Sequence, residues 1–218
     1  MSNKIITEEM IDLLRIRAVE GMSEKRRVHT LAVERMAMRL GAIYAPDKIN
    51  ILRAAALLHD VTKEIKLAGQ LELCEKYGIE FTENDKLAPK TFHAKTAAKV
   101  IEDRFPEFAD DEIISAVRWH TTGREGMSVC EKIIYLADYI DDSRSLPDCV
   151  KLREFFWGAD ISKMTESEKN DHLRDTLVLS FDMTVKILLE ENSPIAKDTF
   201  DARNELICER LKANEMKG

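Results

Sequence analysis

The sequence predicts an all-α protein built as a bundle of helices. Apolar residues recur three or four positions apart along most of the 218-residue chain, which is the spacing of one buried helix face. No segment alternates apolar and polar residues as a half-buried strand would. Only 8 glycines and 5 prolines are present, too few for the many tight turns of an all-β fold. These three observations favour helices that pack against one another.

Capping residues place the first three expected helices. Thr7 caps the first, and acidic residues follow it in the first turn, where the helix dipole favours them. Ser23 caps the second, and Gly41 is expected to end it, because glycine readily adopts the left-handed conformation after a helix. Pro46 suits the first turn of a third helix, whose apolar stripe ends at His59.

Similar end signals bound the helices that follow. They are expected at Lys66–Tyr77, at His93–Phe105, after the cap Asp110, from the capping box Ser128–Glu131 to about Asp141, from the capping box Thr165–Glu168 to about Glu191, and after the cap Asp198. Residues 78–92 are interpreted as a loop and residues 145–168 as a hinge or variable connection. No repeat or long linker divides the chain, so we expect one domain over residues 1–218.

Composition excludes several classes of partner. The 33 basic and 40 acidic residues give a formal charge of −7, which argues against non-specific binding of nucleic acid. The sequence shows no signal-peptide segment and no apolar run near the roughly 20 residues of a membrane helix. The four cysteines form no CxxC pair and predict reduced thiols. We therefore expect a cytoplasmic protein with no nucleic-acid and no membrane partner.

A His-Asp pair closes an apolar helix. His59 and Asp60 directly follow the run Ala54–Leu58. Aspartate is seldom buried unless it is paired or bound to a metal ion. Taken alone, the pair also fits a plain alternative, in which Asp60 ends the helix and His59 is a core histidine.

Other polar residues on apolar helix faces favour the metal interpretation. His29 lies beside the stripe of the second helix, and His120 closes the stripe of the sixth. Asp138 lies between apolar residues of the seventh helix, where its charge needs a partner. Mixed nitrogen and oxygen ligands suit iron, manganese, zinc and similar cations. The fifth histidine, His172, belongs to no such pattern and is expected at the surface.

The order His29, His59-Asp60, Asp138 resembles the signature of the HD-domain metal-dependent phosphohydrolases. Within them, the chain is most similar to the YqeK-type subgroup, the symmetrical diadenosine tetraphosphate hydrolases of bacteria. The resemblance rests on these stretches: Lys25–Thr30, Ala54–Lys63, His93, Trp119–Gly123, Lys132–Ile140, Arg144, Asp198–Thr199 and Ala202–Asn204. It implies an HD-domain helical bundle with a core at about residues 23–144 and a C-terminal helical extension packed on it. Residues 157–170 depart from the subgroup, because they form a longer and more polar stretch.

The resemblance also implies roles for individual residues. It implies His29, His59, Asp60 and Asp138 as ligands of one metal ion, and a second ion held by His93 and His120. The implied catalytic residues are Asp60, Lys63, His93 and His120. The implied nucleotide-binding residues are Arg26, His29, Lys63, Glu64, Ile65, Lys66, His93, His120, Thr121, Asp138, Arg144, Ile195, Ala196, Asp198 and Thr199.

The activity that the resemblance implies is metal-dependent cleavage of diadenosine tetraphosphate into two ADP. A dinucleoside polyphosphate is then the substrate and an ADP- or GDP-type nucleotide the product. One or two divalent ions are expected, iron first, with manganese, cobalt and zinc as alternatives, and a homodimer is left open. Two other functions stay open: an HD phosphohydrolase that acts on another nucleotide, and a non-catalytic nucleotide-binding sensor.

Overall fold

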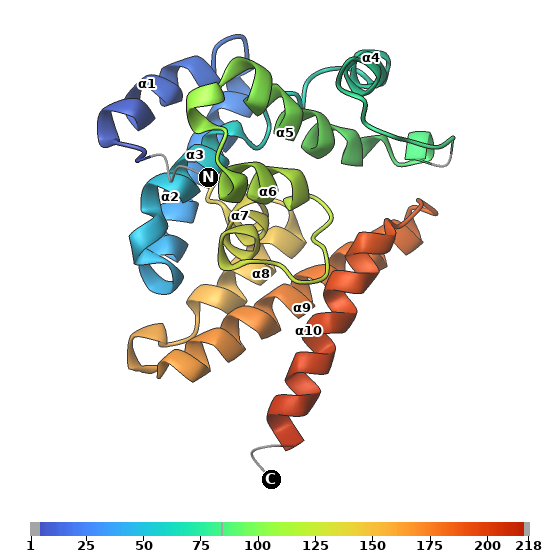
Figure 1. The fold of residues 1–218 in the computed structure, drawn as a ribbon. Helices are drawn as coiled ribbons and strands as arrows, with labels where there is room; N and C mark the ends of the chain where they lie inside the picture. Colours follow the sequence, from blue (N-terminus) through green and yellow to red (C-terminus); the bar gives the residue numbers. More distant parts are fainter. Residues whose placement is uncertain (1–4, 84, 216–218) are drawn as a thin grey trace.

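The computed structural model of this chain describes residues 5–83 and 85–215. Within these two ranges the secondary structure consists of helices, and no β-strand is present (Figure 1). The α-helices are α1 (Glu8–Ala18), α2 (Glu24–Tyr44), α3 (Ile49–Leu58), α4 (Leu67–Tyr77), α5 (Phe92–Arg104), α6 (Asp111–Trp119), α7 (Val129–Ile140), α8 (Pro147–Trp157), α9 (Glu166–Glu190) and α10 (Lys197–Glu215). The all-α prediction is confirmed. None of these helices combines the length and apolar character of a membrane-spanning segment. The ends of the expected 1–218 domain lie outside the described residues.

Helix α3 lies at the centre of the molecule. Every residue from Leu52 to Leu58 is buried, and α1, α2, α6 and α7 pack around the helix. A helix that is apolar nearly all round is stabilised by burial on every side. The two residues that follow it, His59 and Asp60, are therefore held inside the fold.

Helix α7 joins the central helices to the C-terminal ones. It packs against α2, α3 and α6, and also against α8 and α9. Its residues Ile133–Ala137 are buried, and Asp138 follows them. Helix α10 packs along α9, and Figure 1 shows both at the end of the molecule away from α4. The C-terminal helices thus lie next to the helix that carries Asp138.

Most predicted helix ends are confirmed. Gly78 ends α4 in the left-handed conformation, with φ 63°. Five predicted caps accept a hydrogen bond from a backbone N–H of the first turn: Thr7, Ser23, Asp110, Ser128 and Thr165. Both expected capping boxes form. Local sequence therefore determined these boundaries through the unpaired N–H groups that open every helix.

The prediction that Gly41 ends the second helix is wrong, because α2 continues to Tyr44. A Cβ at position 41 would lie 2.6 Å from Cδ1 of Leu52 and 2.9 Å from Cδ1 of Ile49. The glycine therefore allows the close approach of α2 and α3, and its role is in packing.

Two predictions for the C-terminal part are also wrong. Helix α10 begins at Lys197, so Asp198 lies in its first turn and does not cap it. Residues 145–168 are more than a connection, because they contain α8, which buries Leu152 and Phe156. The apolar stripe of α8 is short and lies within a mostly polar segment. The helical period of the sequence is therefore weak there, and the helix was not predicted.

His172 was expected at the surface, and this prediction is wrong as well. Its side chain is half-buried on α9 and stacks on the rings of Phe155 and Phe156. Its Nε2 lies 3.0 Å from the carbonyl oxygen of Phe156. His172 thus helps to pack α9 on α8.

The turn after α6 gives a testable packing prediction at Gly123. This residue has φ 64°, and a Cβ there would lie 2.6 Å from Cζ of Phe181 and 3.2 Å from Cβ of Ala202. We expect Gly123→Ala to lower the free energy of unfolding by about 1–2 kcal/mol through the backbone and by about 1–3 kcal/mol more through overpacking. Urea unfolding measures the loss.

Gly21 offers a matched control for this prediction. It has φ 76°, and no atom lies within 4 Å of the position that its Cβ would take. Gly21→Ala is therefore expected to lose the backbone contribution alone. Equal losses for the two variants would contradict the packing argument at Gly123.

Candidate metal centre

Helices from distant parts of the chain bring six His and Asp side chains together. Five are buried and Asp138 is partly buried. They are His29 on α2, His59 and Asp60 after α3, His93 on α5, His120 after α6 and Asp138 on α7. Metal sites in helix bundles are built in this way, from inward side chains of facing helices.

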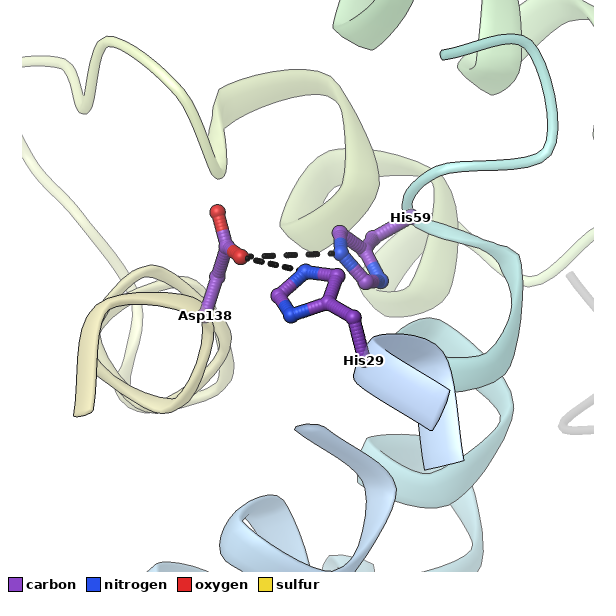
Figure 2. Close-up of side chains that lie close together, drawn as sticks. All are labelled: His29, His59 and Asp138. Carbon is purple, nitrogen blue, oxygen red and sulfur yellow. Dashed lines mark ion pairs between the residues drawn. The ribbon is translucent and has the colours of Figure 1, made fainter. Parts of the chain in front are cut away.

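One group within the centre contains His29, His59 and Asp138. Figure 2 shows both imidazole rings directed at the same carboxylate. Oδ1 of Asp138 lies 2.9 Å from Nε2 of His29 and 3.8 Å from Nε2 of His59. One ligand atom from each residue lies within 4.8 Å of the others. Two histidines and one carboxylate in this arrangement form a ligand set typical of divalent transition metals.

A second group contains His59, Asp60 and His120, whose ligand atoms also lie within 4.8 Å of one another. Oδ2 of Asp60 lies 3.3 Å from Nε2 of His59 and 3.6 Å from Nε2 of His29. The other oxygen, Oδ1, lies 3.3 Å from Nε2 of His93 and 3.8 Å from Nε2 of His120. Asp60 therefore lies between His29 and His59 on one side and His93 and His120 on the other, with one oxygen directed to each pair.

Backbone carbonyls orient two of the histidines. Nδ1 of His59 lies 2.6 Å from the carbonyl oxygen of Ala56, and Nδ1 of His120 lies 2.7 Å from that of Val117. A carbonyl oxygen only accepts hydrogen bonds, so each Nδ1 carries the hydrogen. In the neutral rings, the lone pair is then on Nε2 and is directed into the centre, as metal binding requires.

Several polar atoms in the centre lack a hydrogen bond. Among the described residues, the buried atoms without a hydrogen-bond partner include Nε2 of His29, Nε2 of His59 and Oδ1 of Asp60. A buried polar atom left unpaired costs about 1–3 kcal/mol. The two nitrogens face Asp138, and Oδ1 of Asp60 faces His93 and His120. Unpaired atoms in these places fit a bound cation, and the residues present can hold a metal ion.

Both central carboxylates are held in the ionised form. Burial raises the pKa of Asp60, but the nearby His59 and His120 rings outweigh it and hold that pKa well below its usual range. Burial also raises the pKa of Asp138, but the charge of Arg144 and the hydrogen bond with His29 outweigh it and hold that pKa well below its usual range. Ionised carboxylates are the form that binds metal ions.

The histidines divide into two kinds. Burial lowers the pKa of His93 to about 4 and also lowers the pKa of His120, so both are neutral at pH 7. Burial acts in the same direction on His29, but the Asp138 and Asp141 carboxylates outweigh it and raise its pKa to about 9. A bound cation would take the place of the proton that these carboxylates favour on His29.

Three basic side chains reach the edge of the centre. Arg26 of α2 forms an ion pair with Asp60, and Nζ of Lys63 lies 3.1 Å from Nε2 of His93. Arg144 forms an ion pair with Asp138 and donates from Nε to its backbone carbonyl at 2.8 Å. These side chains place three basic groups beside the carboxylates of the centre, although the chain as a whole is acidic.

A cavity of about 570 Å³ opens beside the centre. Its polar part is lined by Lys63, His120, Thr121, Asp138 and Arg144. Its walls come from the loop before α5, from α7 and α8, and from the end of α9 and the start of α10, and much of their surface is apolar. Small-molecule sites have this size and this combination of apolar walls with a few polar groups.

The other expected nucleotide-binding residues divide between the cavity and its surroundings. Ala196 and Thr199 line the cavity, and Thr199 also donates to the carbonyl oxygen of Thr122 at 3.0 Å. Eight of the fifteen expected residues are not part of the cavity lining: Arg26, His29, Glu64, Ile65, Lys66, His93, Ile195 and Asp198. Glu64 accepts hydrogen bonds from the backbone N–H and the hydroxyl of Ser23, so it stabilises the start of α2.

Sequence reasoning missed part of the cavity wall. Tyr135 and Tyr139 line the cavity together with Asp138. Tyr135 lies three positions before Asp138 and four before Tyr139, and residues at these separations share a helix face, so the helical position of Asp138 pointed to Tyr135 and through it to Tyr139. Leu146 and Cys149 also line the cavity, and the interpretation of residues 145–168 as a connection hid them.

Comparison with known proteins places the chain in a family. The HD domain family model matches residues 26–142. The symmetrical bis(5'-nucleosyl)-tetraphosphatase of Bacillus subtilis (strain 168) is 30% identical over 193 residues, which are 86% of this chain and 92% of the relative. The protein of that name from Staphylococcus aureus (strain NCTC 8325 / PS 47) is 28% identical over 189 residues, 86% of this chain and 89% of the relative.

A solved structure agrees with these relatives. The crystal structure of an HD superfamily hydrolase from Clostridium acetobutylicum, described as involved in NAD metabolism, has a TM-score of 0.77 and 29% sequence identity to this chain. The match covers 91% of this chain and 97% of the other. The chain therefore belongs to the HD domain family, in the group that contains the symmetrical bis(5'-nucleosyl)-tetraphosphatases.

Proposed function

We propose that this protein is a metal-dependent hydrolase of dinucleoside polyphosphates that cleaves diadenosine tetraphosphate symmetrically into two ADP. The observation that carries the proposal is the position of a buried His/Asp centre, with unpaired inward atoms, at the polar end of a 570 Å³ cavity. Basic side chains lie where the cavity meets the centre, and a polyphosphate chain would reach the centre there. The names of the curated relatives support the substrate and the symmetrical cleavage.

The ligand assignment is the one that the resemblance to the HD family implies. His29, His59, Asp60 and Asp138 would hold one ion, and His93 and His120 a second, with Asp60 between them. Mixed histidine and aspartate ligands suit iron, which the resemblance puts first, and they also suit manganese, cobalt and zinc. A divalent ion bound here supplies a nucleophile at neutral pH and neutralises phosphate charge.

The remaining residues of the site would bind and orient the polyphosphate. The guanidinium groups of Arg26 and Arg144 present planar pairs of N–H donors that match phosphate oxygens. Lys63 adds a positive charge beside His93, and burial lowers the pKa of its ammonium group. Negative charge builds up on the phosphate oxygens as the anhydride bond breaks, so fixed cations here would lower the barrier.

The cavity would hold one nucleoside. Thr121, Ala196 and Thr199 line it and are the expected contacts that directly face the ligand. Ile195 and Asp198 flank them, and Glu64, Ile65 and Lys66 follow Lys63 at the turn after α3. The apolar walls would bury a base and shield it from bulk water.

Incubation with diadenosine tetraphosphate, followed by chromatography of the products, tests this proposal. The expected result is ADP as the single product, with activity lost after metal is removed and regained when a divalent ion is added. Formation of ATP and AMP would contradict symmetrical cleavage. Faster hydrolysis of another nucleotide from a panel would favour a different HD phosphohydrolase, and tight nucleotide binding without turnover would favour a sensor. The cytoplasmic location stays a prediction.

A further inference from the structure

Two adjacent aspartates follow α7, and they differ completely in their surroundings. The side chain of Asp141 is 0% exposed, whereas that of Asp142 is 59% exposed. Asp142 lies 3.6 Å from Arg39 at the surface. No step of the proposed reaction uses Asp141, and a carboxylate is seldom buried without a purpose that offsets its desolvation.

The contacts of Asp141 fix its carboxylate in one orientation. Its Oδ1 accepts hydrogen bonds from the backbone N–H of Ser143, at 2.8 Å, and from the hydroxyl of the same residue. Its Oδ2 lies 3.3 Å from Nδ1 of His29 and 3.4 Å from Nε of Arg144. Arg153 donates to the carbonyl oxygens of both Asp141 and Arg144, which holds the turn in place. One oxygen is thus bound by the turn, and the other faces His29.

Asp141 lies beside Nδ1 of His29, as backbone carbonyls lie beside Nδ1 of two other histidines. Nδ1 of His59 faces the carbonyl oxygen of Ala56, and Nδ1 of His120 faces that of Val117. For His29, the group that faces Nδ1 is a side-chain carboxylate, with its Oδ2 at ion-pair distance, 3.3 Å, while Nε2 is directed at Asp138 and Asp60. The orientation of His29 therefore depends on a group that a substitution can change without altering the backbone.

We infer that Asp141 is a positioning residue that holds the His29 ring through Nδ1, so that Nε2 presents its lone pair to the metal centre. This inference rests on the proposed function, since it assumes that the centre binds a metal ion. Partners of this kind orient metal-binding histidines and fix their tautomer, and their loss typically costs about 10–100-fold in metal affinity.

Asp141→Asn is the most informative variant, because it keeps the shape of the side chain. The N–H of Ser143 requires an acceptor, so the amide oxygen stays there and the NH₂ group turns toward His29. A donor at this position favours the hydrogen on Nε2 of His29, and in that tautomer Nε2 has no lone pair to offer the centre. Asp141→Ala removes the partner altogether and serves as a second variant.

The test is to titrate Mn²⁺ alone into the metal-free protein and to measure the binding by calorimetry. Thermal unfolding of the metal-free variants shows whether they fold. We expect Asp141→Asn to weaken Mn²⁺ binding about 10–100-fold, Asp141→Ala to weaken it at least as much, and the adjacent control Asp142→Asn to stay within about twofold of wild type. Mn²⁺ affinity of Asp141→Asn within about twofold of wild type would overturn the inference, even if its melting temperature falls.

The design separates this inference from the proposed function. If the wild-type protein binds Mn²⁺ but does not hydrolyse diadenosine tetraphosphate, the substrate proposal fails and the comparison of Asp141 variants still decides the inference. If the wild-type protein does not bind Mn²⁺, the metal centre itself is overturned, and the inference about Asp141 with it.

Discussion

Replacing His59 with alanine is expected to abolish both metal retention and hydrolysis of diadenosine tetraphosphate. His59 belongs to both ligand groups of the centre, so one substitution weakens both. Its ring is fully buried and its Nδ1 is held by the carbonyl oxygen of Ala56, so its Nε2 has a fixed position at the centre that alanine cannot supply. Loss of several kcal/mol of metal-based stabilisation corresponds to a fall in kcat of about 1,000-fold or more.

Metal analysis of the purified variant and a kinetic assay with product chromatography measure this effect. Asp138→Ala is expected to behave in the same way, because its carboxylate completes the group with His29. His172→Gln is the matched control, since His172 lies on α9 outside both ligand groups, and it should keep its metal content and its turnover. Full activity of both His59→Ala and Asp138→Ala would exclude the proposed centre.

Removing the guanidinium group of Arg144 is expected to lower kcat/KM about 10- to 100-fold. Arg144 lies between the centre and the cavity, where it contacts Asp138 and lines the cavity wall. A hydrogen bond to a charged group contributes about 1.5–3 kcal/mol, which corresponds to this range of rate at about 1.4 kcal/mol for each factor of ten. Initial-rate kinetics on Arg144→Ala with diadenosine tetraphosphate measure the change.

Two further variants give this prediction its control. Arg144→Lys keeps the charge but loses the planar pair of donors, so it should recover only part of the activity. Arg27 is exposed on α2 and pairs with Glu24, so Arg27→Ala should leave kcat/KM unchanged. Full activity of Arg144→Lys would show that charge alone, and not the bidentate geometry, is what the site requires.

The helices and their ends could be predicted because their causes are local. The side-chain oxygens of Ser128 and Thr165 bond to N–H groups three residues away, so a four-residue pattern was sufficient. Gly41 shows where this reasoning fails. Its left-handed preference is a local property, but its position in the fold is decided by Leu52 and Ile49, which approach it from another helix.

The centre could be predicted in part because its residues are unusual where they stand. A histidine and an aspartate after five buried apolar residues, and an aspartate inside an apolar helix, indicate a polar site within the core. The resemblance to the HD family then selected which residues belong together. Asp141 had no such signal, because the sequence Asp141-Asp142 does not say which carboxylate is buried.

The sequence by itself determined that this is an all-α protein, where most of its helices begin, and which His and Asp residues are candidates for one site. Those features follow from the 3.6-residue period, from backbone hydrogen bonds at helix ends and from the cost of burying charge. Only the tertiary structure decided which histidines lie on each side of Asp60, where the cavity opens beside them, and that Asp141 contacts His29. These depend on how α2, α3, α6 and α7 pack, and atoms far apart in the chain meet only through that packing.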